Sequence, residues 1–427
     1  FFFISILNAH TFDMTTTSYR AFFVCLFILL FFLAFKCSKE SRFSLCGSSE
    51  LSCGNVFNIW SNSRIKVVIR YETTTTRLSA IDNQAASLDY SWKKNMLHFF
   101  SMKACSVASP DFRPATWLEN IVIMIGVQKG GTKAIHTFLE ENPMFASRCS
   151  EEKATKEIFF FTNKTHLLNN IDQEELQIEY ADTFQSMCPW AVSTLESNSS
   201  MMYLDDTPNY MQDSHEIPQL INCVMPRAKI LAILRNPTDR AFSHYNFYLK
   251  RNWCKERTFD EWVDINIDEL THAGIVNASD PFEELLAWKN YNNNRINRGL
   301  RKCRTFVTRG LYAIQLLHFM TALEAAGRPS SDLYVLLSEK LSGDTKQAEY
   351  DKLVEFIQLA PHTLHHKKTV HATSYEAEMN ESTQIKLDTF FQPYNFRLYE
   401  MLGWDPVWEK NYTFESIENL QQENHIS

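Results

Sequence analysis

Residues 121–133, IVIMIGVQKGGTK, constrain the fold of this 427-residue chain more than any other segment. Five apolar residues run directly into Gly126, which is typical of a short strand buried on both faces. The segment 134–143 then predicts a helix that ends at Pro143. A strand, a glycine-containing loop and a helix in this order expose backbone N–H groups at the helix amino end. The sequence therefore predicts an anion-binding turn at the end of a buried strand.

Two further apolar runs, 229–234 and 333–337, also lack the alternation of a half-exposed strand. A helical pattern follows the first run at 240–251, and another precedes the second run at 309–327. Strands that alternate with helices indicate an α/β fold, with a parallel sheet flanked by helices. The segment 378–403 predicts a closing helix. Ligands of such sheets bind beyond the carboxyl ends of the strands, where the loops are.

The loop after the first predicted strand offers a candidate phosphate site. Gly130 and Gly131 let the backbone approach an anion closely, Lys129 adds a positive charge, and Thr132 can donate a hydroxyl hydrogen bond. Lys133 stands in the first helical turn, where the helix dipole disfavours a cation unless an anion binds nearby. An ordinary strand-to-helix turn explains the same glycines without any ligand.

A nucleotide P-loop is a rival interpretation of this loop. Gly126 and Gly131 have the P-loop spacing, and MMYLDD at 201–206 superficially resembles a Walker B strand. A kinase or ATPase, however, requires a lysine followed by serine or threonine, and here the order is Thr132-Lys133. A P-loop kinase therefore remains the second enzyme hypothesis.

Several motifs together resemble those of the lumenal (Golgi) carbohydrate sulfotransferases. GVQKGGTKA at 126–134 resembles their 5′-phosphosulfate loop, a P-loop-like turn, and LRNPTDRAFSHY at 234–245 resembles their 3′-phosphate segment. KEIFFF at 156–161 resembles the family's glutamate–aromatic segment, and QPYNFRLYEMLG at 392–403 its closing pattern. The resemblance covers about 119–410, and the heparan sulfate and chondroitin-type O-sulfotransferases are the nearest members.

This resemblance implies an enzyme that transfers a sulfuryl group in line from 3′-phosphoadenosine 5′-phosphosulfate (PAPS) to a glycan hydroxyl. Glu157 matches the catalytic glutamate and is the expected general base, since the aromatic residues after it can raise its pKa by burial. Lys129 is expected at the leaving-group oxygen, and Gly130, Gly131 and Thr132 around the phosphosulfate. Because lysines neutralise the developing charge, no metal is expected.

The resemblance implies a second set of donor contacts. Arg235 leaves a buried strand and can fork onto the 3′-phosphate, and Ser243, about two helical turns further on, can reach the same phosphate. Lys133 is expected on the phosphosulfate, while Tyr312 is a weaker candidate that core packing explains almost as well. The basic segment HHKKTVHA resembles a late loop of the 3-O-type enzymes and adds Lys367 and Lys368.

Some residues depart from the family pattern or allow another interpretation. Where 3-O-type enzymes have V-E-K-T-P, this chain has a second acid, Asp206, in place of the lysine, so we expect different acceptor contacts. A glycan-binding module that has lost catalysis is a third hypothesis, against which the intact lysine, glutamate, arginine and serine argue. Four histidines offer a metal cluster as an alternative, without a zinc-enzyme spacing: His362, His365, His366 and His371.

The amino-terminal part predicts membrane attachment. The run 21–35 is wholly apolar but shorter than the roughly 20 residues that span a bilayer, so an uncleaved signal-anchor and a cleaved signal peptide both fit, and we expect the anchor. Residues before Met14 are interpreted as an extension or as part of a fragment. The expected segments are a tail at 1–20 (1–13 not necessarily translated), the anchor at 21–35, a stem at 36–118, the catalytic domain at 119–410 and a tail at 411–427.

Charge, sequons and cysteines favour a lumenal enzyme. The net charge of -8 gives no support for a nucleic-acid binder, because such domains carry a basic excess. Ten cysteines form no C-x-x-C pair, and Cys254 with Cys303 is one disulfide that an oxidising compartment allows, beside free thiols. We therefore expect a type II Golgi membrane glycoprotein, or alternatively a secreted one. Five N-x-S/T sequons are present: Asn163, Asn198, Asn277, Asn380 and Asn411.

Overall fold

The computed structural model places its described residues in one compact unit, Leu78–Ser427. No helix among these residues is both long and apolar enough to cross a membrane. The predicted anchor, and Lys367 and Lys368, lie outside the described residues. The structure describes residues 82–102, 108–109, 111–146, 149–150, 157–164, 172–297, 303–365, 375 and 378–409.

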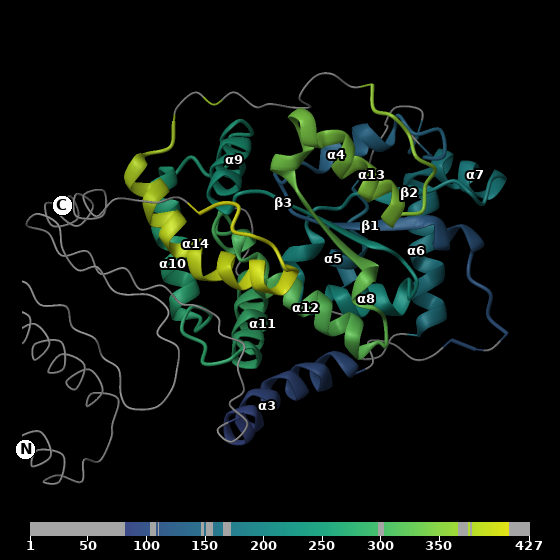
Figure 1. The fold of residues 1–427 in the computed structure, drawn as a ribbon. Helices are drawn as coiled ribbons and strands as arrows, with labels where there is room; N and C mark the ends of the chain where they lie inside the picture. Colours follow the sequence, from purple (N-terminus) through teal and green to yellow (C-terminus); the bar gives the residue numbers. More distant parts are fainter. Residues whose placement is uncertain are drawn as a thin grey trace, which may run out of the picture. The chain divides into compact units, whose positions relative to one another are not determined.

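A four-stranded parallel sheet forms the centre of this unit, in the order β2-β1-β3-β4 (Figure 1). The predicted parallel α/β class is confirmed, and β4 has the predicted bounds. β2 has only three residues and lies at one edge, where the sequence suggested a Walker B-like segment. The strands are β1 Ile121–Gly126, β2 Tyr203–Asp205, β3 Ile230–Leu234 and β4 Leu333–Leu337.

Alternate residues of β1 and β3 serve two separate cores, which explains why both strands are apolar throughout. Ile123 and Ala232 face a core that α6, α7, α8 and α12 cover, whereas Met124 and Ile233 face a core that α4 and α13 cover (Figure 1). The sheet is thus flanked by helices on both sides, as a parallel sheet requires. The bounds are α4 Thr132–Leu139, α6 Gln173–Met187, α7 Pro189–Ser197, α8 Ile217–Val224, α12 Tyr312–Ala325 and α13 Lys346–Phe356.

Most of the remaining helices build a third core beside the sheet, around Trp288 and Phe306, both fully buried. The predicted closing helix is present as α14, and the predicted helix after β3 as α9 (Figure 1). Pro237 begins α9, a position where proline's missing N–H costs nothing. The helices of this third core are α9 Pro237–Leu249, α10 Phe259–His272, α11 Pro281–Asn297 and α14 Glu381–Leu402, whereas the short helix α5 Phe160–Lys164 belongs to the core that α6, α7, α8 and α12 cover. Short 3-10 turns are η1 Thr116–Asn120, η3 Tyr210–Asp213, η4 Thr308–Gly310, η5 Ser330–Asp332, η6 Ser338–Leu341 and η7 Gly343–Thr345.

Helix α3, Asp82–Ser101, falls inside the segment expected to be a stem. It packs on α11 and α12, and its Met96 and Phe100 are buried against Leu285 and Ala322. The compact unit therefore begins before the boundary at residue 119 that the sequence suggested.

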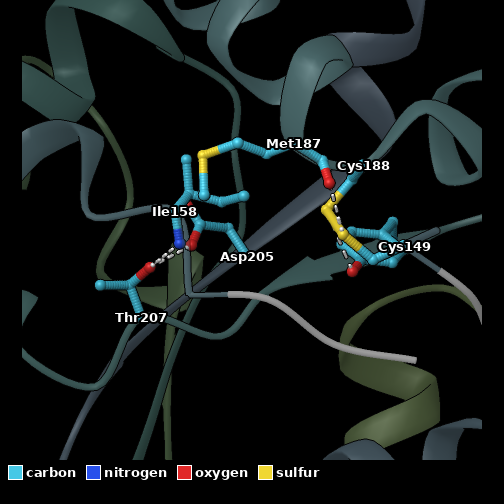
Figure 2. The surroundings of a disulfide bond; sticks show 7 residues. Cys149, Ile158, Met187, Cys188, Asp205 and Thr207 are labelled. Atoms are coloured by element: carbon cyan, nitrogen blue, oxygen red, sulfur yellow. Dashed lines mark hydrogen bonds between the residues drawn. A yellow bond between two sulfur atoms is a disulfide. The ribbon is translucent and has the colours of Figure 1, made fainter. Parts of the chain in front are cut away.

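Two disulfides between described residues tie loops of the unit together. The Cys254–Cys303 pairing is confirmed and joins the turn after α9 to the segment before η4. A second bond, Cys149–Cys188, was not predicted; it joins the chain ahead of Glu157 to the start of α7 (Figure 2). Both connect segments far apart in sequence, as is common in proteins of oxidising compartments.

Candidate active site

The loop after β1 lies directly against the end of β3. The Val127 N–H donates to the Ile233 carbonyl oxygen at 2.9 Å, and the Gly130 N–H donates back to the Val127 carbonyl oxygen at 2.8 Å. A Cβ on Gly130 would lie 2.6 Å from the Ile233 carbonyl oxygen, too close for any side chain. Glycine at this position therefore allows the loop to rest on the neighbouring strand.

The same loop ends in left-handed backbone that begins α4. Lys129 has φ 70° and Gly131 has φ 109°, and Gly131 is the N-cap residue of the helix. Thr132 and the exposed Lys133 form its first turn, as predicted. Ser338, directly after β4, lies so close that its hydroxyl would be 3.1 Å from a Cβ on Gly131. The segment after β4, which lies on the other side of β3 from β1, thus also reaches this loop.

The segment after β3 is fixed through its backbone. Arg235 follows the strand, and its carbonyl oxygen accepts the Tyr312 hydroxyl at 2.9 Å. The Asn236 side chain caps α9 by accepting the Asp239 N–H at 3.1 Å. Ser243 lies buried on α9. Tyr312 is buried, and its hydroxyl hydrogen bond holds the Arg235 carbonyl oxygen in place.

The two segments share one electrostatic site. The pKa of Lys129 lies below its usual value, first because the side chain is partly buried and then because positive charges surround it. These charges belong to Arg235 after β3, Arg251 and Lys250 after α9, and Lys133 in α4. The predicted phosphosulfate loop and the predicted 3′-phosphate arginine therefore lie together, where an anion would relieve their mutual repulsion.

Two members of this site were missed by the sequence analysis. The Lys129 ammonium lies 4.8 Å from the centre of the Phe247 ring, and the Arg251 guanidinium carbon lies 3.6 Å from the same centre. Phe247 and Arg251 follow Ser243 at successive intervals of four residues, which place side chains on one face of a helix. That spacing was a usable signal.

Glu157 reaches the same group of charges from another direction. The residue as a whole is exposed, yet burial of its carboxyl group by neighbouring protein raises its pKa, as the sequence analysis expected. The positive charges of Arg309 and Lys133 oppose this rise, and the negative charge of Asp205 adds to it. Arg309 also donates to the Asn209 side-chain oxygen at 2.7 Å. Glu157 and the loop after β1 are thus coupled through Lys133.

The backbone after Glu157 is held by Thr207, at the carboxyl end of β2. The N–H groups of Ile158 and Phe159 both donate to the Thr207 hydroxyl oxygen, at 2.9 and 3.2 Å. That hydroxyl donates to the Asp205 carboxylate at 2.7 Å, and the Ile158, Thr207 and Asp205 contacts are drawn in Figure 2. The short edge strand therefore positions this segment.

Two adjacent buried acids stand beside these groups. Burial raises the pKa of Asp205 to about 6, although three hydroxyl donors oppose the rise. Burial raises the pKa of Asp206 to about 8, and the charges of Asp205 and Glu157 add to it. One Asp206 carboxyl oxygen has no hydrogen-bond partner among the described residues. The pKa of Asp206 is thus raised well above that of an ordinary aspartate, mainly because the carboxyl group is buried.

A protein-family model described as "Sulfotransferase domain" matches residues 119–298. The matched region is thus similar to a known sulfotransferase domain. It includes the loop after β1, Glu157, the Asp205–Thr207 segment and all of α9. Arg309 and Tyr312 lie beyond the matched residues and complete the site from the carboxyl-terminal side.

Curated proteins that are similar to this region are named as heparan sulfate enzymes. Human bifunctional heparan sulfate N-deacetylase/N-sulfotransferase 2 is 34% identical over 123 residues, which are 29% of this chain and 12% of the relative. Mouse heparan sulfate glucosamine 3-O-sulfotransferase 5 is 26% identical over 180 residues, 42% of this chain and 45% of the relative. The matches thus span less than half the length of either relative.

A solved structure of a sulfotransferase from Alicyclobacillus acidocaldarius is also similar, with 20% sequence identity and a TM-score of 0.43. The alignment covers 69% of this chain and 97% of the bacterial one.

Among the described residues, no three His, Cys, Asp or Glu side chains are grouped so that they could hold a metal ion. Of the histidines considered as a cluster, the rings of His362 and His365 lie 5.8 Å apart between centres. His366 and His371 are outside the part of the chain that the structure describes.

Proposed function

We propose that this chain transfers the sulfuryl group of PAPS to a hydroxyl group of a glycan. The convergence of the loop after β1 with the start of α9 carries this proposal, because the anionic groups at both ends of the nucleotide would meet cations there. Glu157, coupled to the same site through Lys133, supplies a group that can take a proton.

The 5′-phosphosulfate would be held by the loop after β1. Gly130 and Gly131 leave room for the anion beside the backbone, and the amino end of α4 adds N–H groups and positive potential. Lys129, Thr132 and Lys133 supply charge and a hydroxyl. PAPS provides the activated sulfuryl group, and the cations of this chain neutralise its anionic groups.

The 3′-phosphate would be held by Arg235 and Ser243. Arg235 can fork onto a phosphate, and Ser243 lies buried on the helix that begins directly after this arginine. Tyr312 contributes by fixing the Arg235 carbonyl oxygen rather than by touching the nucleotide. We propose Lys367 and Lys368 as further donor contacts because of their resemblance to a basic loop of the family.

Glu157 would act as general base toward the acceptor hydroxyl. A carboxylate works best as a base when its pKa approaches the working pH, and burial moves the pKa of Glu157 in that direction. Lys129 would stand at the bridging oxygen, where charge develops as the sulfuryl group leaves. The donor loop thus follows β1, and the segment that carries the base is held by Thr207, which follows the neighbouring strand β2.

The acceptor would be a polysaccharide or glycoprotein glycan in the Golgi lumen. The printed names of the relatives point to heparan sulfate-type glycans, and the cations around Arg251 suit an acidic chain. The two disulfides suit an oxidising lumen. We propose residues 21–35 as the membrane anchor, with the catalytic unit on the lumenal side.

Incubation of the purified protein with PAPS and a panel of glycans tests the proposal. Glu157→Gln is expected to lower kcat by about 10²- to 10⁴-fold, while the Kd for adenosine 3′,5′-bisphosphate stays within about threefold. Glu355→Gln, at an exposed position of α13, is the matched control. Absence of both sulfuryl transfer and bisphosphate binding would refute the proposal, and magnesium-dependent ATP binding would favour the kinase hypothesis.

A further inference from the structure

We propose that Thr207 and Asp205 are positioning residues for Glu157: the Thr207 hydroxyl fixes the backbone that carries the base, and the Asp205 carboxylate fixes that hydroxyl. This inference rests on the proposed function, because it assigns the pair a role through the catalytic base. Neither residue needs to touch PAPS or the glycan for this role.

The hydroxyl of Thr207 uses its full hydrogen-bonding capacity. Its oxygen accepts the Ile158 N–H at 2.9 Å, and its proton goes to Asp205 at 2.7 Å (Figure 2). The same oxygen also accepts the Phe159 N–H at 3.2 Å. The Ile158 N–H belongs to the same planar peptide unit as the Glu157 carbonyl group. Fixing this N–H therefore fixes the orientation of the peptide that follows the base.

Asp205 sets the direction of every bond in this relay. The residue is fully buried, and its second carboxylate oxygen accepts the hydroxyls of Tyr180 and Tyr210 at 3.2 and 3.1 Å. With Thr207, three donors converge on one carboxylate. Only an acceptor satisfies all three, so the Thr207 proton must point to Asp205 and leave its oxygen free for the two N–H groups.

The base depends on this backbone support. Among the residues that the structure describes, the Glu157 carboxylate forms no hydrogen bond or ion pair of its own, so its place is set by the chain that bears it. Phe159 has φ 56°, left-handed backbone that a bulky residue seldom adopts unaided. Two amide hydrogen bonds to Thr207 hold this turn, and the buried rings of Phe160 and Phe161 anchor the start of α5 directly after it.

Thr207→Val tests the inference, because it removes the hydroxyl and keeps the shape. We expect kcat to fall by about 10- to 100-fold, since a displacement near 1 Å has that effect on a reacting group. The acceptor KM and the bisphosphate Kd should change less than about threefold, and Thr207→Ser should restore most of kcat. Thr271→Val, which removes an exposed hydroxyl that bonds only within α10, is the matched control.

A double-mutant cycle separates positioning from general support of the fold. Active protein is counted by bisphosphate titration, and Thr207→Val is measured in the wild-type and the Glu157→Gln backgrounds. If Thr207 acts through the base, Thr207→Val lowers kcat in the wild-type background and leaves kcat almost unchanged in the Glu157→Gln background. An equal loss in both backgrounds, or no loss in either, would overturn the inference.

Two further outcomes are also decisive. If Thr207→Val does not fold, Asp205→Asn takes its place in the same cycle, since an amide nitrogen there would face a hydroxyl donor. If the wild-type protein transfers the sulfuryl group and these variants keep an unchanged kcat, the positioning inference is refuted while the proposed function stands. Absence of transfer by the wild-type protein refutes the proposed function itself.

Discussion

Replacement of Gly130 by alanine is expected to weaken donor binding because the loop after β1 has no room for a methyl group. The added Cβ would lie 2.6 Å from the Ile233 carbonyl oxygen and 2.8 Å from the Val127 side chain. Ordinary contact begins at 3.4 Å, so the loop must move by about 0.8 Å. The neighbouring atoms include the backbone of a central strand, which cannot yield as a flexible side chain can.

A displacement of this size should lower the affinity for adenosine 3′,5′-bisphosphate by about 100-fold, which equals about 2.7 kcal/mol. The overpacking should also lower the free energy of unfolding by about 1–3 kcal/mol. Isothermal titration calorimetry and urea unfolding measure the two effects. Gly327→Ala is the control: it has φ +70° and open space around it, so we expect a stability loss of about 1 kcal/mol and unchanged binding. Folded Gly130→Ala protein that binds the bisphosphate within threefold of wild type would refute this reasoning.

Three more predictions concern charge and cross-linking. Arg309→Met removes a positive charge that lowers the pKa of Glu157, so the acidic limb of the kcat/KM profile should move to higher pH; a move to lower pH would contradict the assignment. The double variant Cys254→Ser, Cys303→Ser removes a disulfide that spans 49 residues, so the free energy of unfolding measured with urea should fall by about 4 kcal/mol. A fall of less than about 1 kcal/mol would contradict this expectation. Asp206 has a pKa of about 8 when folded, above that of an unfolded aspartate, so its burial costs stability increasingly as pH rises from about 4 to 8. Asp206→Asn should therefore raise the Tm more at pH 8.5 than at pH 5, and an equal change at both would be inconsistent.

The sheet was predictable where strands are buried on both faces. β1, β3 and β4 appear in the sequence as continuous apolar runs because each of their faces meets a layer of helices. β2 was harder to recognise, since it has three residues, ends in one acid and is followed directly by another. Helix α3 was missed because it lies in a segment that was interpreted as a stem, and only packing on α11 and α12 shows that it belongs to the unit.

The candidate site was predictable where its chemistry is local. Gly130, Gly131 and Arg235 follow strand ends, and the need for bare backbone or a charge there can be derived from neighbouring residues. The support of Glu157 was not accessible in this way, because Thr207 lies 48 residues from Phe159 and the two meet only through the order of the strands. Asp206 was recognised as a departure from the family pattern, but its burial and raised pKa depend on the tertiary structure.

The strand order has an evolutionary consequence. The segments proposed to grip the nucleotide follow β1 and β3, the two inner strands, whereas Asp205, Asp206 and Thr207 stand at the edge, on β2 or directly after it. Of these three residues, Asp205 and Thr207 hold the backbone after Glu157, so Asp206 is the one that can vary without disturbing either the base or the inner strands. A chain with this strand order can change an edge residue such as Asp206, where it departs from the family pattern, while the proposed donor site on the inner strands stays the same.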